Sequence, residues 1–386
     1  MRVMRAEPKR FADVTTKSVG AVWRAYDLQL TTYAALLGAV GLVMAYTNSI
    51  EAGQSVLANG TVFSRALMWS GIAIVVFIVM TIFDYRWLKT LAWPIYGANV
   101  ALLVLTLAIG NGVGGSARWV SFGPLTFQFS ELAKILMIIV LATYLGNREG
   151  RLDNVVAILG ACLLMVPPWI LVMMQPDLGT SLVLASILAG MLFMSGASLR
   201  WLLAMGLGVV AAVPIAWTYV LKEYQKERIV SFLSPCTDVQ GSCWQVYQSQ
   251  STVGSGGFLG VGLTNGAHLR GGFLPVQESD FVFAVLAQEL GFLGAVLVFL
   301  IFAALIWRIL TAAWKSRDPF GTMFGAGLAS ILLFQILVNV GMVIGIMPVT
   351  GIPLPFISHG GASLISLAIG LGIIQSINIR QSKAEW

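Results

Sequence analysis

Residues 281–307 read FVFAVLAQELGFLGAVLVFLIFAALIW, an apolar run whose only charged side chain is Glu289. A helix needs roughly 20 mostly apolar residues to cross about 30 Å of hydrocarbon, so this run can span a membrane. Nine more stretches share its character: 28–47, 62–83, 91–109, 131–146, 155–174, 178–194, 199–221, 320–346 and 357–378. The sequence therefore predicts an all-α polytopic membrane protein with ten transmembrane helices.

The composition of the whole chain agrees with this interpretation. Of the 386 residues, 58% are hydrophobic and 10% are charged, whereas soluble domains are about 25% charged. These charges are too few to keep the surface in water, which excludes a soluble globular enzyme, a disordered protein and a disulfide-stapled secreted domain. Acidic residues are rare inside the spans, which argues against a β-barrel with its alternating polar and apolar positions.

The positive charges indicate how the helices are oriented. Ten spans place both termini on one side of the membrane, and most of the 23 Lys and Arg residues fall on that side. The short loops on the opposite side hold one clear positive charge, Arg118. Because Lys and Arg are enriched in cytoplasmic loops, we expect both termini in the cytoplasm. The net charge of +6 then reports topology, and we expect no nucleic-acid partner.

This orientation divides the chain into segments. Residues 1–27 form a cytoplasmic N-terminal segment without an apolar core, so we expect no cleaved signal peptide. Residues 28–380 form the membrane domain, and residues 381–386 form a cytoplasmic tail. Two long loops face outward, at 110–130 and 222–280. The second loop carries aromatic residues and many glycines, and we interpret it as a folded extracellular cap.

Two of the three cysteines, Cys236 and Cys243, lie in the longer outer loop. The predicted topology places them in an oxidising compartment, where we expect a disulfide; the alternative is two free thiols. Cys162 lies inside a span and is interpreted as a small buried apolar residue. The sequence contains neither the Cys and His spacing of a metal site nor a nucleotide-binding glycine motif.

The first outer cluster of polar residues is GSARWVSFGPLTFQFSELAK, residues 115–134. Ser130 is a suitable N-cap for the span that follows. Glu131 and Lys134 are three residues apart and share one face of the helix. They form either an ion pair that neutralises itself or, with Arg118 nearby, a cationic hydrogen-bonding site for an anionic substrate.

Two aspartates stand just before apolar spans, where each has a structural and a functional interpretation. Asp177, in QPDLGTSL (175–182), either caps the following helix or belongs to a site. The same alternatives hold for Asp280, in LPVQESDFVF (274–283). A capping position would lower the pKa of Asp280 through the helix dipole, whereas partial burial would raise it.

The stretch MPVTGIPLPFISHGGAS, residues 347–363, interrupts an apolar region with three prolines and three glycines. It predicts irregular backbone at membrane depth, which proteins tolerate only where it is buried or lines a cavity. Together with the three clusters above, it predicts a polar chamber that opens to the outside.

These stretches resemble the SEDS family (shape, elongation, division and sporulation), whose members include RodA and FtsW. The resemblance covers residues 25–380 and rests on six motifs: GSARWVSFGPLTFQFSELAK, QPDLGTS, ERIVSFLSP, YQSQSTVGSGGFLGVGL, FLPVQESDFVFAVLAQELGFLG and PVTGIPLPFISHGGAS. The PVTGIPLPF form and the DYRWL sequence after the second span are more similar to RodA than to FtsW.

The resemblance implies a peptidoglycan glycosyltransferase of the bacterial plasma membrane that polymerises lipid II at the outer face during cell elongation. It implies inversion at the sugar, with undecaprenyl pyrophosphate as the leaving group. It further implies a class B penicillin-binding protein (a transpeptidase) as partner, together with other elongation-machinery proteins. A flippase of the same lipid, an FtsW-type division polymerase and a non-catalytic scaffold are the alternatives.

The family's essential aspartate matches Asp280, which we interpret as the catalytic base. The candidate substrate-binding residues are Glu131, Lys134, Arg118, Asp177, Arg65, Arg228, Gln128, Ser130, Gln175 and Ser358. A divalent cation, Mg²⁺ or Mn²⁺, held by Asp280 and the substrate phosphates would be consistent with this site. The chain departs from the family at Val276 and at Glu278-Ser279, which puts any role of those flanking side chains in doubt. It also departs at Phe129, where the family has proline, so we expect a different bend at the entry to the fourth span.

Overall fold

The computed structural model describes residues 25–51, 58, 60–113, 116–122, 125–148, 155–219, 221–233, 242–266 and 279–381. Its helices are α2 (Leu28–Glu51), α3 (Val62–Ile82), α4 (Tyr85–Thr90), α5 (Ala92–Ile109), α6 (Phe129–Gly146), α7 (Val155–Met174), α8 (Leu178–Met194), α9 (Leu199–Tyr219), α10 (Glu223–Leu233), α11 (Ser242–Ser255), α13 (Val282–Trp314), α14 (Pro319–Val343) and α15 (Gly361–Gln381). Three short strands, β1 (Asn111–Val113), β2 (Ser116–Phe122) and β3 (Leu125–Phe127), form one antiparallel sheet.

Among the described residues, eight helices are long and apolar enough to cross a membrane: α2, α3, α5, α6, α7, α13, α14 and α15. Two shorter apolar stretches, Leu178–Met194 and Leu199–Pro214, lie at the other two predicted positions. The polytopic, all-α class is confirmed, with the small sheet as an addition. The count of ten spans and the placement of the termini remain predictions.

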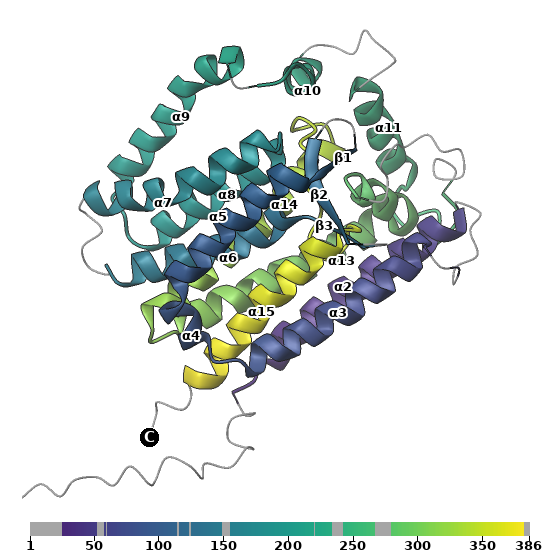
Figure 1. The fold of residues 1–386 in the computed structure, drawn as a ribbon. Coiled ribbons are helices and arrows are strands. Elements are labelled where there is room, and N and C mark those ends of the chain that lie inside the picture. Colours follow the sequence, from purple (N-terminus) through teal and green to yellow (C-terminus); the bar gives the residue numbers. More distant parts are fainter. Residues whose placement is uncertain are drawn as a thin grey trace, which may run out of the picture.

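The helices pack around α6 and α14, which lie in the middle of the bundle (Figure 1). Helix α14 contacts α6, α8 and α13, and α15 packs on both α3 and α6. Helix α9 lies apart from the bundle in Figure 1 and has its main contact with α8. The central helices are buried on nearly all sides, so polar groups on them have to find partners, or a cavity, inside the protein.

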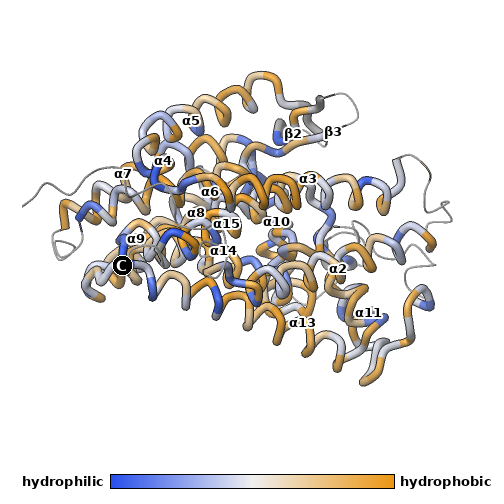
Figure 2. Tube along the Cα trace, turned by 90° about the horizontal axis from the view of Figure 1, so that it is seen from below, coloured by the Kyte–Doolittle hydropathy of each residue, from blue (hydrophilic) through white to orange (hydrophobic). Residues whose placement is uncertain are grey.

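The outward faces of the helices are apolar. Residues such as Ile74 on α3 and Leu300 on α13 are exposed, and Figure 2 shows hydrophobic residues along both helices. In water such a surface would aggregate, whereas in a bilayer it faces lipid. The surface pattern therefore agrees with the span assignment made from the sequence.

Helix α13 is interrupted at Gly291, where the backbone takes a φ of 68°. A turn at residues 257–262 packs into this break: Phe292 N–H donates to the Gly257 carbonyl at 3.0 Å, and Gly262 N–H donates to the Glu289 carbonyl at 3.1 Å. A Cβ atom at Gly291 would collide with the backbone of Gly260. The backbone amides and carbonyls at the break therefore hydrogen-bond to protein, as they must inside a membrane, where lipid offers no partners.

The 222–280 loop is folded where it is described, because it contains α10 and α11. Helix α11 packs on α13 and α14, and Ser249 Oγ donates to the Val343 carbonyl at 2.8 Å. The predicted disulfide lies outside the described residues, since Cys236 and the Cys243 side chain are not described. The cap is thus anchored to the two helices that approach the polar chamber.

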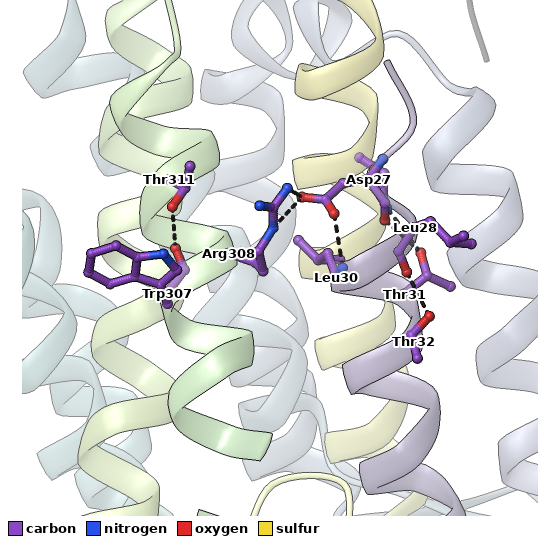
Figure 3. Close-up of polar contacts among 9 residues, drawn as sticks. Asp27, Leu28, Leu30, Thr31, Thr32, Trp307, Arg308 and Thr311 are labelled. Carbon is purple, nitrogen blue, oxygen red and sulfur yellow. Dashed lines mark hydrogen bonds and ion pairs between the residues drawn. The ribbon is translucent and has the colours of Figure 1, made fainter. Parts of the chain in front are cut away.

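At the opposite end of the bundle, the start of α2 is fixed by a buried carboxylate (Figure 3). Asp27 accepts from Arg308 on α13 at 2.9 and 2.5 Å, and it also accepts from the Leu30 amide at 3.0 Å. Gln375 on α15 donates to the Asp27 carbonyl at 2.6 Å and accepts from its amide at 3.1 Å. One residue therefore joins three helices.

We predict that Asp27→Ala lowers the stability of the protein by about 2–4 kcal/mol, because it leaves Arg308 without its acceptor and removes the cap of α2. Thermal unfolding of the purified protein in detergent measures the change. Glu223→Ala is the matched control, since it breaks the pair with Lys226, in which Glu223 is 82% exposed, and such pairs contribute little. Equal losses in the two variants would contradict the role given to Asp27.

Candidate functional site

A cavity of about 220 Å³ opens among the ends of several helices. Its walls come from β2, the first turns of α6 and α8, α10, the residues before α13, α14 and the loop at 350–353. Seven predicted site residues line it: Arg118, Gln128, Glu131, Lys134, Asp177, Arg228 and Asp280. The predicted clusters, which are distant in sequence, thus meet around one cavity.

Asp280 lies in this wall without capping a helix. The N-cap of α13 is Phe281, which makes no side-chain capping bond, so the capping interpretation is wrong. Asp280 Oδ1 accepts from Ser279 Oγ at 2.9 Å. Asn339 on α14 donates to the Asp280 carbonyl at 3.0 Å and to the Ile352 carbonyl at 2.8 Å. The backbone of Asp280 is therefore held while its carboxylate faces the cavity.

Burial raises the pKa of Asp280 above its ordinary value. The hydrogen bond from Ser279 and the charge of Arg228 lower it, Asp177 raises it, and Arg118 lowers it again, but burial is the largest influence. The sequence left this balance open, because a helix dipole and desolvation act in opposite directions. Since Asp280 is not the cap, desolvation decides the direction.

Asp177 caps a helix, as one interpretation predicted, and it also lines the cavity. Its Oδ1 accepts from the Thr180 amide at 3.1 Å, so it caps α8. Its Oδ2 accepts from Thr180 Oγ1 at 2.8 Å and from Gln128 Nε2 at 2.9 Å, and it also lines the cavity. Ser130 Oγ reaches the same oxygen at 3.4 Å. The carboxylate therefore joins the starts of α6 and α8.

The sequence predicted Ser130 as the N-cap of α6, and this prediction is wrong. The cap position is Gln128, whose side chain makes no capping bond, and Ser130 is fully buried. The helix begins earlier than predicted, at Phe129, which moves Ser130 into its first turn. Its hydroxyl donates to Asp177 instead of capping the helix, so Ser130 supports the site through Asp177.

Arg118 is positioned by backbone carbonyls. Its Nε donates to the Gln175 carbonyl at 3.0 Å, and its Nη2 donates to the Pro176 carbonyl. Gln175 itself is fully buried, with Nε2 bonded to the Leu103 carbonyl at 3.1 Å. Gln175 thus orients Arg118 from outside the cavity. The other arginine of the cavity, Arg228, donates from Nη1 to the Val349 carbonyl at 3.4 Å.

Glu131 and Lys134 form a buried ion pair of 2.6 Å. Both also line the cavity and a small pocket of about 10 Å³ beneath it. The ion pair is present, as one interpretation predicted, and both residues also line the cavity. Since an ammonium carries three donors, Lys134 keeps hydrogen-bonding capacity even though its charge is balanced.

A second cavity of about 210 Å³ adjoins the first, and Trp119 lines both. Arg65 and Ser358 line this second cavity and not the first. Ser358 Oγ donates to the Ser279 carbonyl at 2.6 Å, next to Asp280. The stretch between α14 and α15 is irregular, as predicted; residues 350–353 line the first cavity, and residues 356–360 line the second.

Nine residues that line the cavity were not among the predicted site residues: Trp119, Thr180, Val183, Ser279, Gln335, Thr350, Gly351, Ile352 and Pro353. Sequence reasoning also missed Asn339, which holds the Asp280 backbone. Gln335 and Asn339 are polar residues four apart on an otherwise apolar span, and such residues usually face a functional site. That signal was present in the sequence. Thr350 and Gly351 enter the site only through the path of the loop.

Comparison with known proteins places the chain among cell-wall enzymes. The family described as cell cycle proteins of the FtsW, RodA and SpoVE group matches residues 27–383. Peptidoglycan glycosyltransferase MrdB of Escherichia coli K12 is 37% identical over 305 residues, covering 79% of this chain and 82% of MrdB.

Two solved structures are similar over almost the whole chain. One is a chain of a peptidoglycan synthase complex in which polymerization and crosslinking are structurally coordinated, with a TM-score of 0.78 and 32% identity, covering 93% of this chain and 99% of that one. The other is the rod shape determining protein RodA of Thermus thermophilus, with a TM-score of 0.68 and 30% identity, covering 92% of this chain and 97% of that one.

The ion pair gives a prediction about stability. Glu131→Ala leaves the buried Lys134 charge without its partner and should cost about 3–5 kcal/mol. The double variant Glu131→Ala/Lys134→Met removes both charges and should recover much of that loss. Thermal unfolding of the three proteins measures both changes. A double variant less stable than Glu131→Ala alone would contradict mutual neutralisation.

Proposed function

The chain belongs to the FtsW, RodA and SpoVE family, and on that premise we propose that its cavity polymerises lipid II with Asp280 as the base. The protein is a multi-pass plasma-membrane protein and a peptidoglycan glycosyltransferase. The observation that carries the proposal is the convergence of Asp280, Asp177, Arg118 and Arg228 on one cavity.

The proposed reaction forms a bond between an acceptor hydroxyl oxygen and the anomeric carbon of the donor sugar. The bond from that carbon to undecaprenyl pyrophosphate breaks, and the hydroxyl proton passes to Asp280. The donor is α-linked and the glycan is β-linked, so the configuration inverts and a single base suffices. A raised pKa makes the carboxylate of Asp280 a better proton acceptor near neutral pH.

The leaving pyrophosphate needs positive charge more than a proton, because its own charge is delocalised. Arg118 and Arg228 line the same cavity as Asp280, and guanidinium groups match phosphate oxygens in a bidentate manner. Lys134 adds hydrogen-bond donors, although Glu131 balances its charge. We assign the phosphate to the arginine end of the cavity for this reason.

A divalent cation remains part of the proposal. Within the described residues, no three carboxylate, imidazole or thiol groups cluster as a ligand set. Mg²⁺ often takes one or two carboxylates and completes its shell with phosphate oxygens. Asp280, with the substrate pyrophosphate, fits that arrangement. A bound ion would supply charge stabilisation for the leaving group.

A polymerase has to hold two lipid-linked substrates, and the two adjoining cavities offer a place for each. They are similar in volume, at about 220 and 210 Å³, and Trp119 lines both. Arg65 gives the second cavity its own cation. We assign the acceptor and donor lipids to these two cavities, with Asp280 near their junction.

The partner and the cellular process are part of the same proposal. A similar chain belongs to a peptidoglycan synthase complex that coordinates polymerization and crosslinking, and this supports a class B penicillin-binding protein as partner. Similarity to a rod shape determining protein supports a role in cell elongation over an FtsW-type role in division. Other elongation-machinery proteins would then join the complex.

The rival function is translocation of the same lipid. Alternating access distributes charged residues along a path through the bilayer, whereas here they surround cavities near the ends of α6, α8 and α14. One reconstituted system separates the functions, because polymer formation and lipid translocation can be measured in the same vesicles.

We predict that purified Asp280→Ala protein forms glycan strands from lipid II at least about 10²-fold more slowly than the wild type. The variant should still unfold at the wild-type temperature. Asp318→Ala is the matched control, because Asp318 pairs with Lys89 away from both cavities. If folded Asp280→Ala protein polymerised lipid II at the wild-type rate, Asp280 would not be the base.

We also predict the pH dependence of polymerisation. The base works deprotonated, so kcat/KM should fall as pH drops through the raised pKa of Asp280, above the ordinary carboxyl value of about 4. Arg228→Gln removes a charge that lowers this pKa, so the acid limb should move to higher pH. Asp177→Asn removes a charge that raises it, so the limb should move to lower pH. Shifts in the same direction would contradict the electrostatic account.

A further inference from the structure

The wall of the cavity holds a buried amide that has no hydrogen-bond partner among the described residues. Gln335 on α14 is 1% exposed and lines both the main cavity and the small pocket beneath it. Neither its Nε2 nor its Oε1 has a hydrogen-bond partner among the described residues. Roughly 90% of buried polar groups in proteins have a partner, and an exception beside a cavity points to an occupant.

A second group in the same wall shows the same feature. Thr350 Oγ1 is buried without a hydrogen-bond partner in the described part of the chain, and Thr350 lines the main cavity. Gln335 is four residues before Asn339, which holds the Asp280 backbone. The two side chains share a face of α14, about 6 Å apart along the helix axis. The unsatisfied amide is therefore fixed relative to the proposed base.

The small pocket beside Gln335 is electrically neutral, with Ile135, Ile331 and Leu367 as its apolar residues. Glu131 and Lys134 lie beside it and cancel each other in a 2.6 Å ion pair. The other polar residues of the small pocket are Ser363 and Ser366. Arg118 and Arg228 line the main cavity and not this pocket. The pocket beside Gln335 therefore suits an uncharged group, whereas the arginines of the main cavity suit the phosphate.

We propose that Gln335 binds the acetamido group of a 2-acetamido sugar in the lipid-linked substrate, an inference that rests on the proposed function. A glutamine amide has N–H donors and a carbonyl acceptor, and an acetamido group offers the complementary carbonyl and N–H. The sugars of peptidoglycan carry this group. The small pocket holds about one water molecule, so the acetamido group reaches Gln335 from the main cavity.

This contact makes Gln335 a residue of substrate specificity. A site built to hydrogen-bond a polar group discriminates strongly against an analogue that lacks it, because the buried amide then stays unsatisfied. The test uses lipid II and two analogues in which the acetamido group of one sugar or the other is replaced by hydroxyl. Dissociation constants are measured for the full-length protein in nanodiscs.

We expect wild-type protein to bind lipid II at least about 10-fold more tightly than one of the two analogues. Gln335→Met should lose that preference by weakening lipid II alone. Gln288→Met is the matched control, because Gln288 is also 1% exposed but lines neither cavity, and it should keep the wild-type preference. A Gln335→Met protein with wild-type preference would overturn the inference.

The unfolding temperature of the ligand-free protein distinguishes substrate binding by Gln335 from a purely structural role. Gln335→Met removes an unsatisfied amide and should leave the unfolding temperature unchanged or higher. Gln288→Met breaks the bond from Nε2 to Ser255 Oγ at 2.8 Å and should lower it. If Gln335→Met lowers the temperature and keeps the preference, Gln335 is structural. If the Gln335→Met protein does not fold, Gln335→Asn is the second variant, because its shorter side chain moves the amide away from the substrate.

Because binding needs no turnover, the inference and the proposed function fail separately. Wild-type protein that binds none of the three lipids would overturn both. Wild-type protein that polymerises lipid II but binds all three lipids equally would overturn the inference alone. Loss of preference in Gln335→Met together with full activity of Asp280→Ala would support the inference and overturn only the base.

Discussion

The Asp177 carboxylate is the contact on which the geometry of the site depends. Its two oxygens accept from the first turn of α8 and from Gln128 and Ser130 at the start of α6. The two residues before it supply the carbonyls that hold Arg118. A charge at membrane depth is costly unless the protein surrounds it with donors. Satisfying this one charge brings the helix ends and Arg118 together around a cavity.

The same requirement explains the irregular parts of the chain. The turn at 257–262 satisfies the break in α13, and Asn339 satisfies carbonyls at Asp280 and Ile352. At these two places the irregular backbone is paired with protein, so its polar groups do not depend on lipid for partners. Asp280 lies beside Asn339 and the 350–353 loop, desolvated enough to raise its pKa but still in contact with a cavity. Its chemistry thus follows from how the backbone is satisfied.

Much of this was predictable from the sequence, because span length and charge asymmetry are local signals. Helix α8 begins and ends where the pattern placed it, whereas α13 continues past 307 to Trp314. The break at Gly291 was not predictable, since it depends on a turn about 30 residues earlier in the chain. The environment of Asp280 was also undecided, because burial and the helix dipole can be weighed only in three dimensions. Gln335 carried a signal, a buried polar residue in an apolar span, that was passed over.

The central claim is that one cavity holds the reacting groups of a lipid-linked sugar. A cryo-EM structure of the inactive Asp280→Asn protein with lipid II in nanodiscs tests it most directly. The account predicts pyrophosphate density within hydrogen-bonding distance of Arg118 and Arg228, and an acceptor hydroxyl about 3 Å from the residue at position 280. Sugar and pyrophosphate density bound away from these residues would contradict it.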